Sequence, residues 1–170
     1  MPELGVSIYP SKSSYSEMAD FLKRAAYIGY KRIFTSLLEV ADNPQETVGA
    51  FKKIIDFGNE LGMKTSIDVN PQLFERLEIS YKDLSFFKAL GVWSVRLDEG
   101  FTGQEEAEMT RNPYHLKIEI NSSRGQHYVD MILDFKANRD NLIGCHNFYP
   151  QKYTALDFEY FLTTSKQYKN

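Results

Sequence analysis

Apolar and polar residues alternate along several short stretches of this chain, and most of these stretches are followed by a segment with helical periodicity. The clearest alternation runs from 115 to 122. Its apolar residues at 116, 118 and 120 would face one side of a strand, and its polar residues at 117, 119 and 121 the other side. The same reasoning predicts further strands over 5–10, 31–37, 64–71, 93–98 and 142–150.

Segments with an apolar residue every three or four positions fill most of the intervals between these strands. They predict helices over 14–28, 43–61, a short stretch from 80 or 83 to 90, 128–137 and 156–169. Ser14 and Glu17 have the spacing of a capping box at the start of the first helix. The segments 72–79 and 99–113 are predicted to be loops, and the glutamates of the second loop are interpreted as a solvated lid surface.

Strands that alternate with helices through short connections indicate parallel strands and right-handed crossovers. Six such units are too few for the usual eight-stranded barrel. The sequence therefore predicts either an incomplete TIM-type (β/α) barrel with six of eight units or an open doubly wound sheet. No glycine-rich phosphate loop follows the first strand, which weighs against a Rossmann-type fold. One domain over 1–170 is expected.

Composition narrows the class of protein further. Hydrophobic residues make up 42% of the chain and charged residues 25%, which is typical of a folded globular protein. The net charge of −3 and the absence of a basic cluster argue against nucleic-acid and membrane partners. Cys145 is the single cysteine, so no internal disulfide can form. No leader-like segment or long apolar run follows Met1, so a cytoplasmic protein is expected.

In a barrel of parallel strands, the polar row of each strand faces the barrel axis, where uncompensated polar groups are costly. Three carboxylates stand in these rows near strand ends, where barrel active sites lie: Asp68, Asp98 and Glu119. Two carboxyl groups on either side of a glycosidic bond can cleave it. Glu119 is therefore predicted to be the acid/base, with Asp98 or Asp68 as its partner. The alternative is that Arg96 or Lys117 pairs with Asp98 and Glu119 in a purely structural salt-bridge network.

Other polar and aromatic residues near the strand ends are candidates for substrate contacts. They are Tyr9, Asn70, Arg96, Lys117, Asn121, His146, Asn147 and Tyr149. His146 can bind a sugar hydroxyl or be a buried polar group whose hydrogen bonds are satisfied. No ligand pair stands at a metal-binding spacing, so no metal and no cofactor are predicted.

Six motifs at successive strand ends resemble those of a known family. They are VSIYP at 6–10, FTSL at 34–37, SIDVNP at 66–71, VRLDEGF at 95–101, IEINSS at 118–123 and CHNFYP at 145–150. Together they resemble the N-terminal barrel of the 6-phospho-N-acetylmuramidases. The resemblance implies a TIM-type barrel followed by a smaller cyclophilin-like domain. It also implies hydrolysis of a 6-phosphorylated N-acetylmuramyl glycoside, a small-molecule substrate of cell-wall recycling. The chain would then lack the last two barrel strands and the second domain.

Two other functions remain open at this point. A phosphosugar isomerase, epimerase or aldolase would use the same architecture, with Lys117 as base or Schiff-base former. A truncated, non-catalytic remnant would bind sugars or nothing. The exposed strand edges of an incomplete barrel predict that such a chain self-associates into homo-oligomers, aggregates or folds poorly.

Overall fold

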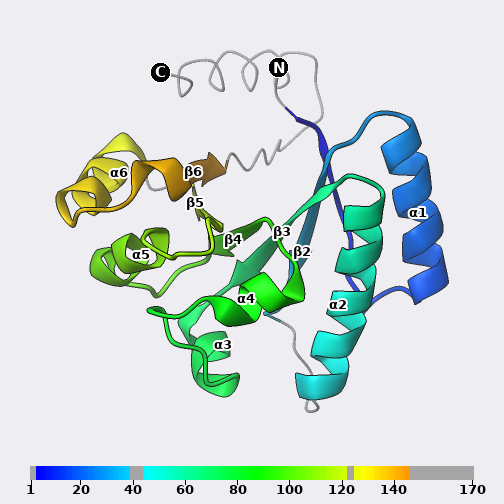
Figure 1. The fold of residues 1–170 in the computed structure, drawn as a ribbon, viewed down its shortest axis with the longest axis horizontal. Coiled ribbons are helices and arrows are strands. Elements are labelled where there is room, and N and C mark those ends of the chain that lie inside the picture. The colour runs from blue at the N-terminus through cyan, green and yellow to red at the C-terminus, as the bar shows by residue number, and fades with distance from the viewer. Residues whose placement is uncertain (1–2, 39–43, 122–124, 146–170) are drawn as a thin grey trace, which may run out of the picture.

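The computed structural model describes residues 3–38, 44–121 and 125–145. Their six strands form one parallel sheet in sequential order, from β1 to β6 (Figure 1). The strands are β1 (Gly5–Ser7), β2 (Arg32–Ser36), β3 (Lys64–Val69), β4 (Ser94–Leu97), β5 (Lys117–Asn121) and β6 (Leu142–Cys145). A doubly wound sheet reverses its strand order partway, whereas a barrel does not. The incomplete TIM-type barrel is therefore confirmed, and the doubly wound alternative is wrong.

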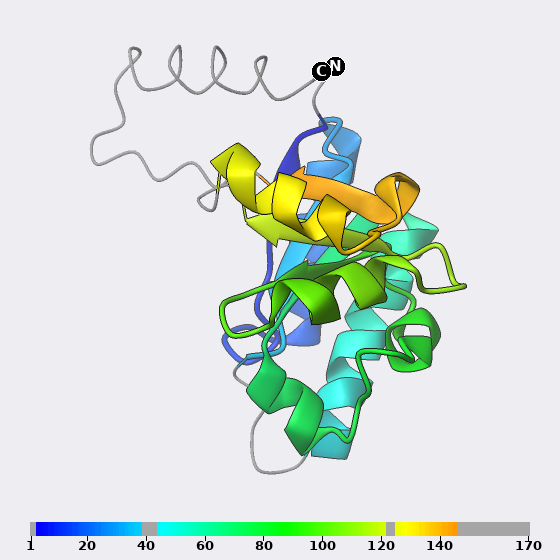
Figure 2. The same ribbon diagram turned by 90° about the vertical axis from the view of Figure 1, so that its left-hand side faces the viewer.

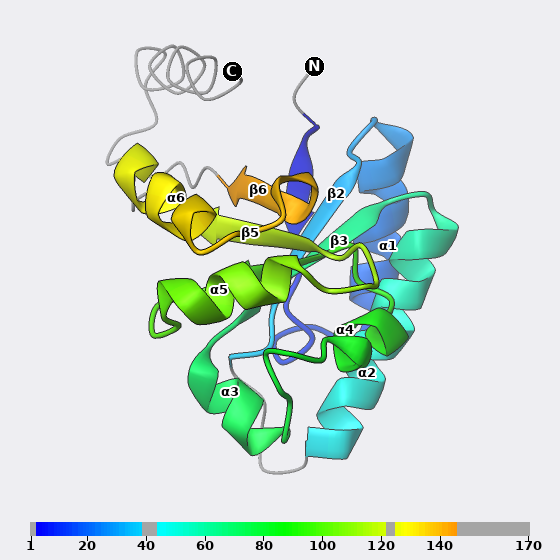
Figure 3. The same cartoon turned by 60° about the vertical axis from the view of Figure 1, so that its left-hand side comes forward.

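The helices line the outer side of this curved sheet (Figures 1 and 3). They are α1 (Tyr15–Tyr27), α2 (Pro44–Glu60), α3 (Pro71–Arg76), α4 (Ser85–Leu90), α5 (Gly103–Thr110), α6 (Gly125–Asp134) and the 3-10 helix η2 (Arg139–Asn141). Seen from the side, α6, α5 and α3 follow one below another along the sheet (Figure 2). No helix in the described part of the chain is long and apolar enough to cross a bilayer.

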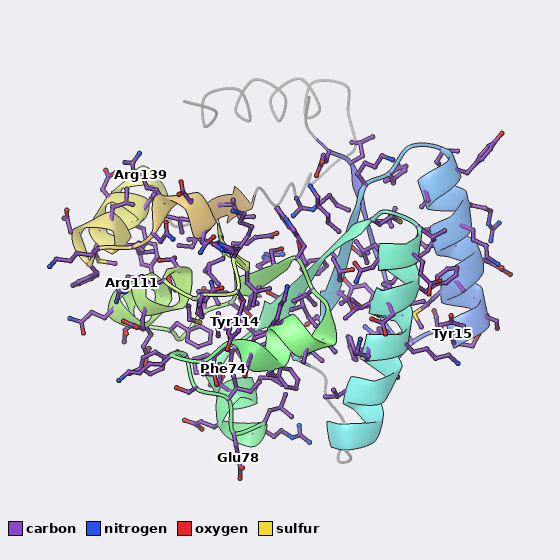
Figure 4. The ribbon with its side chains drawn as sticks, viewed as in Figure 1. Tyr15, Phe74, Glu78, Arg111, Tyr114 and Arg139 are labelled. Atoms are coloured by element: carbon purple, nitrogen blue, oxygen red, sulfur yellow. The ribbon has the colours of Figure 1, made fainter. Side chains whose placement is uncertain are left out.

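The core lies between the helices and the apolar row of each strand. Ile67, Val95 and Ile118 stand in register on β3, β4 and β5, and all three are fully buried. Phe74 of α3 extends this core, with its ring centre 5.6 Å from that of Phe87 and 5.1 Å from that of Phe101 (Figure 4). The apolar row predicted at 116, 118 and 120 is buried as expected, so the opposite row of each strand faces away from the helix layer.

Helix α1 begins with the predicted capping box. The Ser14 side chain accepts a hydrogen bond from the Glu17 amide, and the Glu17 side chain accepts one from the Ser14 amide. The helix buries Met18, Leu22 and Ala25. Phe21 and Ile28 are also part of the predicted apolar stripe, but their exposed fractions are 43% and 69%.

Two segments predicted to be loops contain helices. At the first, the Asn70 side chain accepts a hydrogen bond from the Leu73 amide, and Pro71 opens α3. At the second, a capping box joins Thr102 to Glu105 at the start of α5. The interpretation of the glutamates as a solvated lid surface is also wrong for Glu106, which is fully buried. The predicted helix over 156–169 lies outside the described residues.

Candidate active site

A row of polar side chains crosses the middle of the sheet on the face opposite the helices. Asp68 of β3 stands in register with Arg96 of β4, and Arg96 with Glu119 of β5. Neighbouring strands lie about 4.8 Å apart, so residues in register on one face are close neighbours. The register places a carboxylate, a guanidinium and a second carboxylate side by side, although Asp68 and Glu119 are 51 residues apart in the sequence.

Glu119 is the most heavily hydrogen-bonded member of the row. Its Oε1 lies 2.5 Å from the Ser94 hydroxyl and 2.6 Å from the Ser66 hydroxyl, and it accepts a 2.9 Å hydrogen bond from Arg32 Nη2. The Glu119 side chain is 5% exposed. A charge-assisted hydrogen bond favours the ionised carboxylate. Arg32, which stands at the start of β2, is therefore the cation that pairs with this buried group.

Asp68 lies in a different environment, although it is in the same row. Its Oδ1 is 3.8 Å from Arg96 Nε, and neither atom has a hydrogen-bond partner among the described residues. The pKa of Asp68 is raised to about 6, mainly by burial; the attraction of Arg96 opposes this rise, and the negative charges of Asp98 and Glu119 add to it. Asp68 can therefore gain and lose a proton near neutral pH.

Asp98 completes the group of carboxylates. It follows β4 directly, and its amide donates a 2.9 Å hydrogen bond to the Val69 carbonyl at the end of β3. Its charge acts on the pKa of Asp68, as does that of Glu119. The structure thus brings together the three carboxylates predicted from the sequence, at the middle and carboxyl-terminal part of the sheet.

The arginine assignments differ from the structural alternative considered above. Arg96 pairs with Asp68, and its guanidinium carbon lies 5.1 Å from the centre of the Phe34 ring. Glu119 pairs with Arg32, not with Arg96 or Lys117. Among the described residues, three carboxylates then stand against two guanidinium groups, so this part of the row carries net negative charge when every group is ionised.

Several predicted substrate-binding residues have other contacts in the structure. Lys117 Nζ donates a 2.5 Å hydrogen bond to the Asp140 carbonyl, at the amino-terminal end of β5 and β6. Asn70 uses its side-chain oxygen to cap α3. Tyr9 is exposed, with Lys12 Nζ 5.3 Å from its ring centre. Asn121 ends β5. His146, Asn147 and Tyr149 lie outside the described residues.

Arg32 is the site residue that the sequence prediction missed. The alternation of β2 places Arg32, Phe34 and Ser36 on one face, and the register continues that face into Ser66 and Asp68 of β3. A comparison of this row with its neighbours would have pointed to Arg32. In the part of the chain that the structure describes, no three His, Cys, Asp or Glu side chains are arranged to hold a metal ion.

The fold and this row define an incomplete (β/α) barrel with a cluster of carboxylates on its inner face. Over residues 4–170 the sequence matches the family described as 6-phospho-N-acetylmuramidase, N-terminal. The chain belongs to this family, as the six strand-end motifs indicated. No curated protein matches the chain.

Three solved structures are similar to this chain. An uncharacterized B. cereus protein is 44% identical, with a TM-score of 0.76, over 98% of this chain and 44% of that one. A conserved Enterococcus faecalis protein of unknown function is 21% identical, with a TM-score of 0.77, over 99% and 46% of the two chains. A mutant Thermobaculum terrenum O-GlcNAc hydrolase shares the fold at 14% identity and a TM-score of 0.56, over 84% and 40%. The chain thus spans less than half the length of the first two relatives.

Proposed function

We propose that this chain supplies the carboxylate-bearing part of a glycoside hydrolase. The substrate is a 6-phosphorylated N-acetylmuramyl glycoside, as the family description suggests, and the setting is peptidoglycan recycling in the cytoplasm. The observation that carries the proposal is the contrast between two carboxyl groups in one row, on either side of Arg96. Asp68 has a pKa of about 6, whereas Glu119 accepts a charge-assisted hydrogen bond from Arg32.

Glycoside hydrolysis needs an acid that protonates the leaving oxygen and an anionic group that stabilises the positive charge on the sugar. A carboxyl group whose pKa is raised by its environment is suited to the acid role. We assign the acid/base role to Asp68, whose Oδ1 has no hydrogen-bond partner among the described residues. Glu119 and Asp98 supply the negative charge. This exchanges the roles that the sequence predicted for Asp68 and Glu119.

The net charge of the row also bears on substrate orientation. Three carboxylates against two guanidinium groups attract a sugar that develops positive charge, and they repel a phosphate. The phosphate of the substrate is therefore expected to be held by groups outside this row. Lys117, the candidate Schiff-base former, lies at the amino-terminal end of β5, remote from the strand ends that carry barrel active sites. That placement favours hydrolysis over the isomerase or aldolase alternative.

The test is release of a chromogenic aglycone from a synthetic 6-phospho-N-acetylmuramyl glycoside. The assay uses the chain as it stands and, in parallel, the chain joined to the remaining length of the B. cereus relative, of which it spans 44%. Asp68→Asn and Glu119→Gln are each expected to lower kcat by about 10²–10⁴-fold, the usual contribution of such groups. Asp56→Asn is the matched control, because Asp56 pairs with Lys52 on the outer helix α2.

Near-normal turnover by Asp68→Asn would reject the acid/base assignment. Absence of turnover by both wild-type forms would reject the hydrolase itself. The same glycoside without its phosphate tests the substrate specificity separately from the enzyme class. Hydrolysis of the two glycosides at equal kcat/KM would support a glycosidase but would reject specificity for the phosphorylated sugar.

A further inference from the structure

Arg32 contacts the candidate site from the end of the sheet opposite the expected substrate. It is the first residue of β2, whereas Asp98 follows the last residue of β4. Its Nη2 donates hydrogen bonds to Glu119 Oε1 at 2.9 Å and to the Ser66 hydroxyl at 3.0 Å. Active sites of (β/α) barrels lie at the carboxyl ends of the strands. Arg32 therefore reaches Glu119 without occupying the space in which a substrate would bind.

The guanidinium group of Arg32 is itself held on two further sides. Its central carbon lies 3.7 Å from the centre of the Trp93 ring, a stacked cation–π arrangement. Its Nη1 lies 3.5 Å from Glu3 Oε2, and the Glu3 side chain is 43% exposed. Arg32 thus connects two carboxylates. Glu3 is exposed at the amino-terminal edge of the sheet, whereas the Glu119 side chain is only 5% exposed.

This arrangement requires arginine. A planar guanidinium can stack on an indole ring while it donates in its own plane to Ser66 and Glu119, whereas an ammonium group offers charge without that fixed geometry. A buried carboxylate that loses its cation keeps the cost of its burial. Among the described residues, Glu119 would then be held by the Ser66 and Ser94 hydroxyls alone, without a charged donor.

From these contacts we infer that Arg32, seated on Trp93, is a positioning residue for Glu119. It holds the Glu119 carboxylate in a fixed orientation beneath the reacting sugar. The inference rests on the proposed function, since it assigns Arg32 a part in the same reaction. It adds a residue that contacts neither substrate nor proton, and it predicts an effect on kcat without one on KM.

The first measurement is independent of turnover. Trp93 is the single tryptophan, and its ring current should shift the Arg32 Nε–H resonance upfield in a proton–nitrogen correlation spectrum. Glu119→Gln is expected to move or broaden that resonance, because it removes the charged acceptor of Arg32. Asp56→Asn, which removes a carboxylate on the outer helix α2, should leave the resonance in place. An unshifted resonance in the wild-type protein would show that the stacked arrangement does not exist in solution.

The second measurement is kinetic, in the hydrolysis assay described above. Arg32→Met is expected to lower kcat tenfold or more with KM within about twofold, and Arg32→Lys is expected to recover part of the loss. Asp56→Asn, on the outer helix α2, is the control and should keep kcat within about twofold of the wild type. Rates are normalised to the folded fraction, so a loss of stability alone does not count.

The outcomes separate the two ideas. An active wild type with an Arg32→Met variant of normal kcat overturns the inference and leaves the proposed function intact. A raised KM with normal kcat makes Arg32 a substrate contact and also overturns it. A wild type without turnover rejects the proposed function, and the role of Arg32 in the reaction falls with it.

Discussion

The pH dependence of folding stability offers a direct check on Asp68. Burial raises its pKa from an ordinary value of 3.8 to about 6, with the charges of Asp98 and Glu119 acting in the same direction. The folded protein then holds this proton more tightly than the unfolded chain does. Stability from this group is fully present below about pH 4 and is lost as pH rises through about 6. Asp68 thus opposes folding at neutral pH.

The magnitude follows from the size of the shift. A rise of about two pKa units, at 1.36 kcal/mol per unit, amounts to roughly 3 kcal/mol of unfolding free energy as an upper limit. The Asp68 side chain is only 14% exposed, so solvent screening removes little of this effect. Asp68→Asn abolishes the titration at nearly constant side-chain volume. The unfolding free energy of the wild type, relative to the variant, should therefore fall by up to about 3 kcal/mol between pH 4 and pH 7.

Urea denaturation at several pH values between 4 and 7 measures this difference. Asp56→Asn is again the control, and it should keep the wild-type pH dependence because Asp68 is still present. Parallel curves for the wild type and Asp68→Asn across the whole range would refute the reasoning. They would mean that Asp68 is as well solvated in the folded protein as in the unfolded chain, and the acid/base assignment would lose its physical basis.

Two further predictions concern the scaffold. Thr102→Ala removes the capping box of α5 and should lower the unfolding free energy, measured in urea, by about 1 kcal/mol. Thr102→Ser keeps the hydroxyl and should lower it less. Equal losses in the two variants would contradict the role of the cap. Within the described residues, β1 pairs with β2 alone and β6 with β5 alone, so the 170-residue chain should self-associate in sedimentation analysis; a cooperatively melting monomer would contradict that expectation.

The sequence was informative wherever one physical signal dominated. Alternation along β5 separated the buried residues Ile118 and Ile120 from the polar row that contains Glu119. The Ser14–Glu17 spacing marked the start of α1 correctly. Both signals act within a few residues of the chain, so no tertiary information was needed to interpret them.

The errors arose where signals competed. Gly100, Gly103 and Pro113 suggested a loop, although Thr102 and Glu105 already carried the capping-box spacing that begins α5. Phe21 fits the helical period of α1 and is nevertheless exposed, because periodicity does not fix how wide the buried stripe is. The formation of α5 and the exposure of Phe21 both depend on how the helices pack on the sheet.

The pairing within the site could be predicted only in part. Polar rows indicated which residues share a face, but the choice of cation depends on register between strands. Arg32 and Glu119 are 87 residues apart, and they meet because their side chains extend across the intervening strands β3 and β4. A sequence shows that arginines and carboxylates are available. It does not show which of them touch.

Because the described helices cover one side of the sheet, the two faces of each strand have different roles. Ile67 and Val95 pack in the core beneath the helices, whereas the adjacent Ser66 and Arg96 belong to the inner polar row. The B. cereus and Enterococcus faecalis relatives keep this fold with TM-scores of 0.76 and 0.77, although the second shares only 21% of its residues with this chain. A barrel of this kind can acquire a new reaction without first having to acquire a new fold.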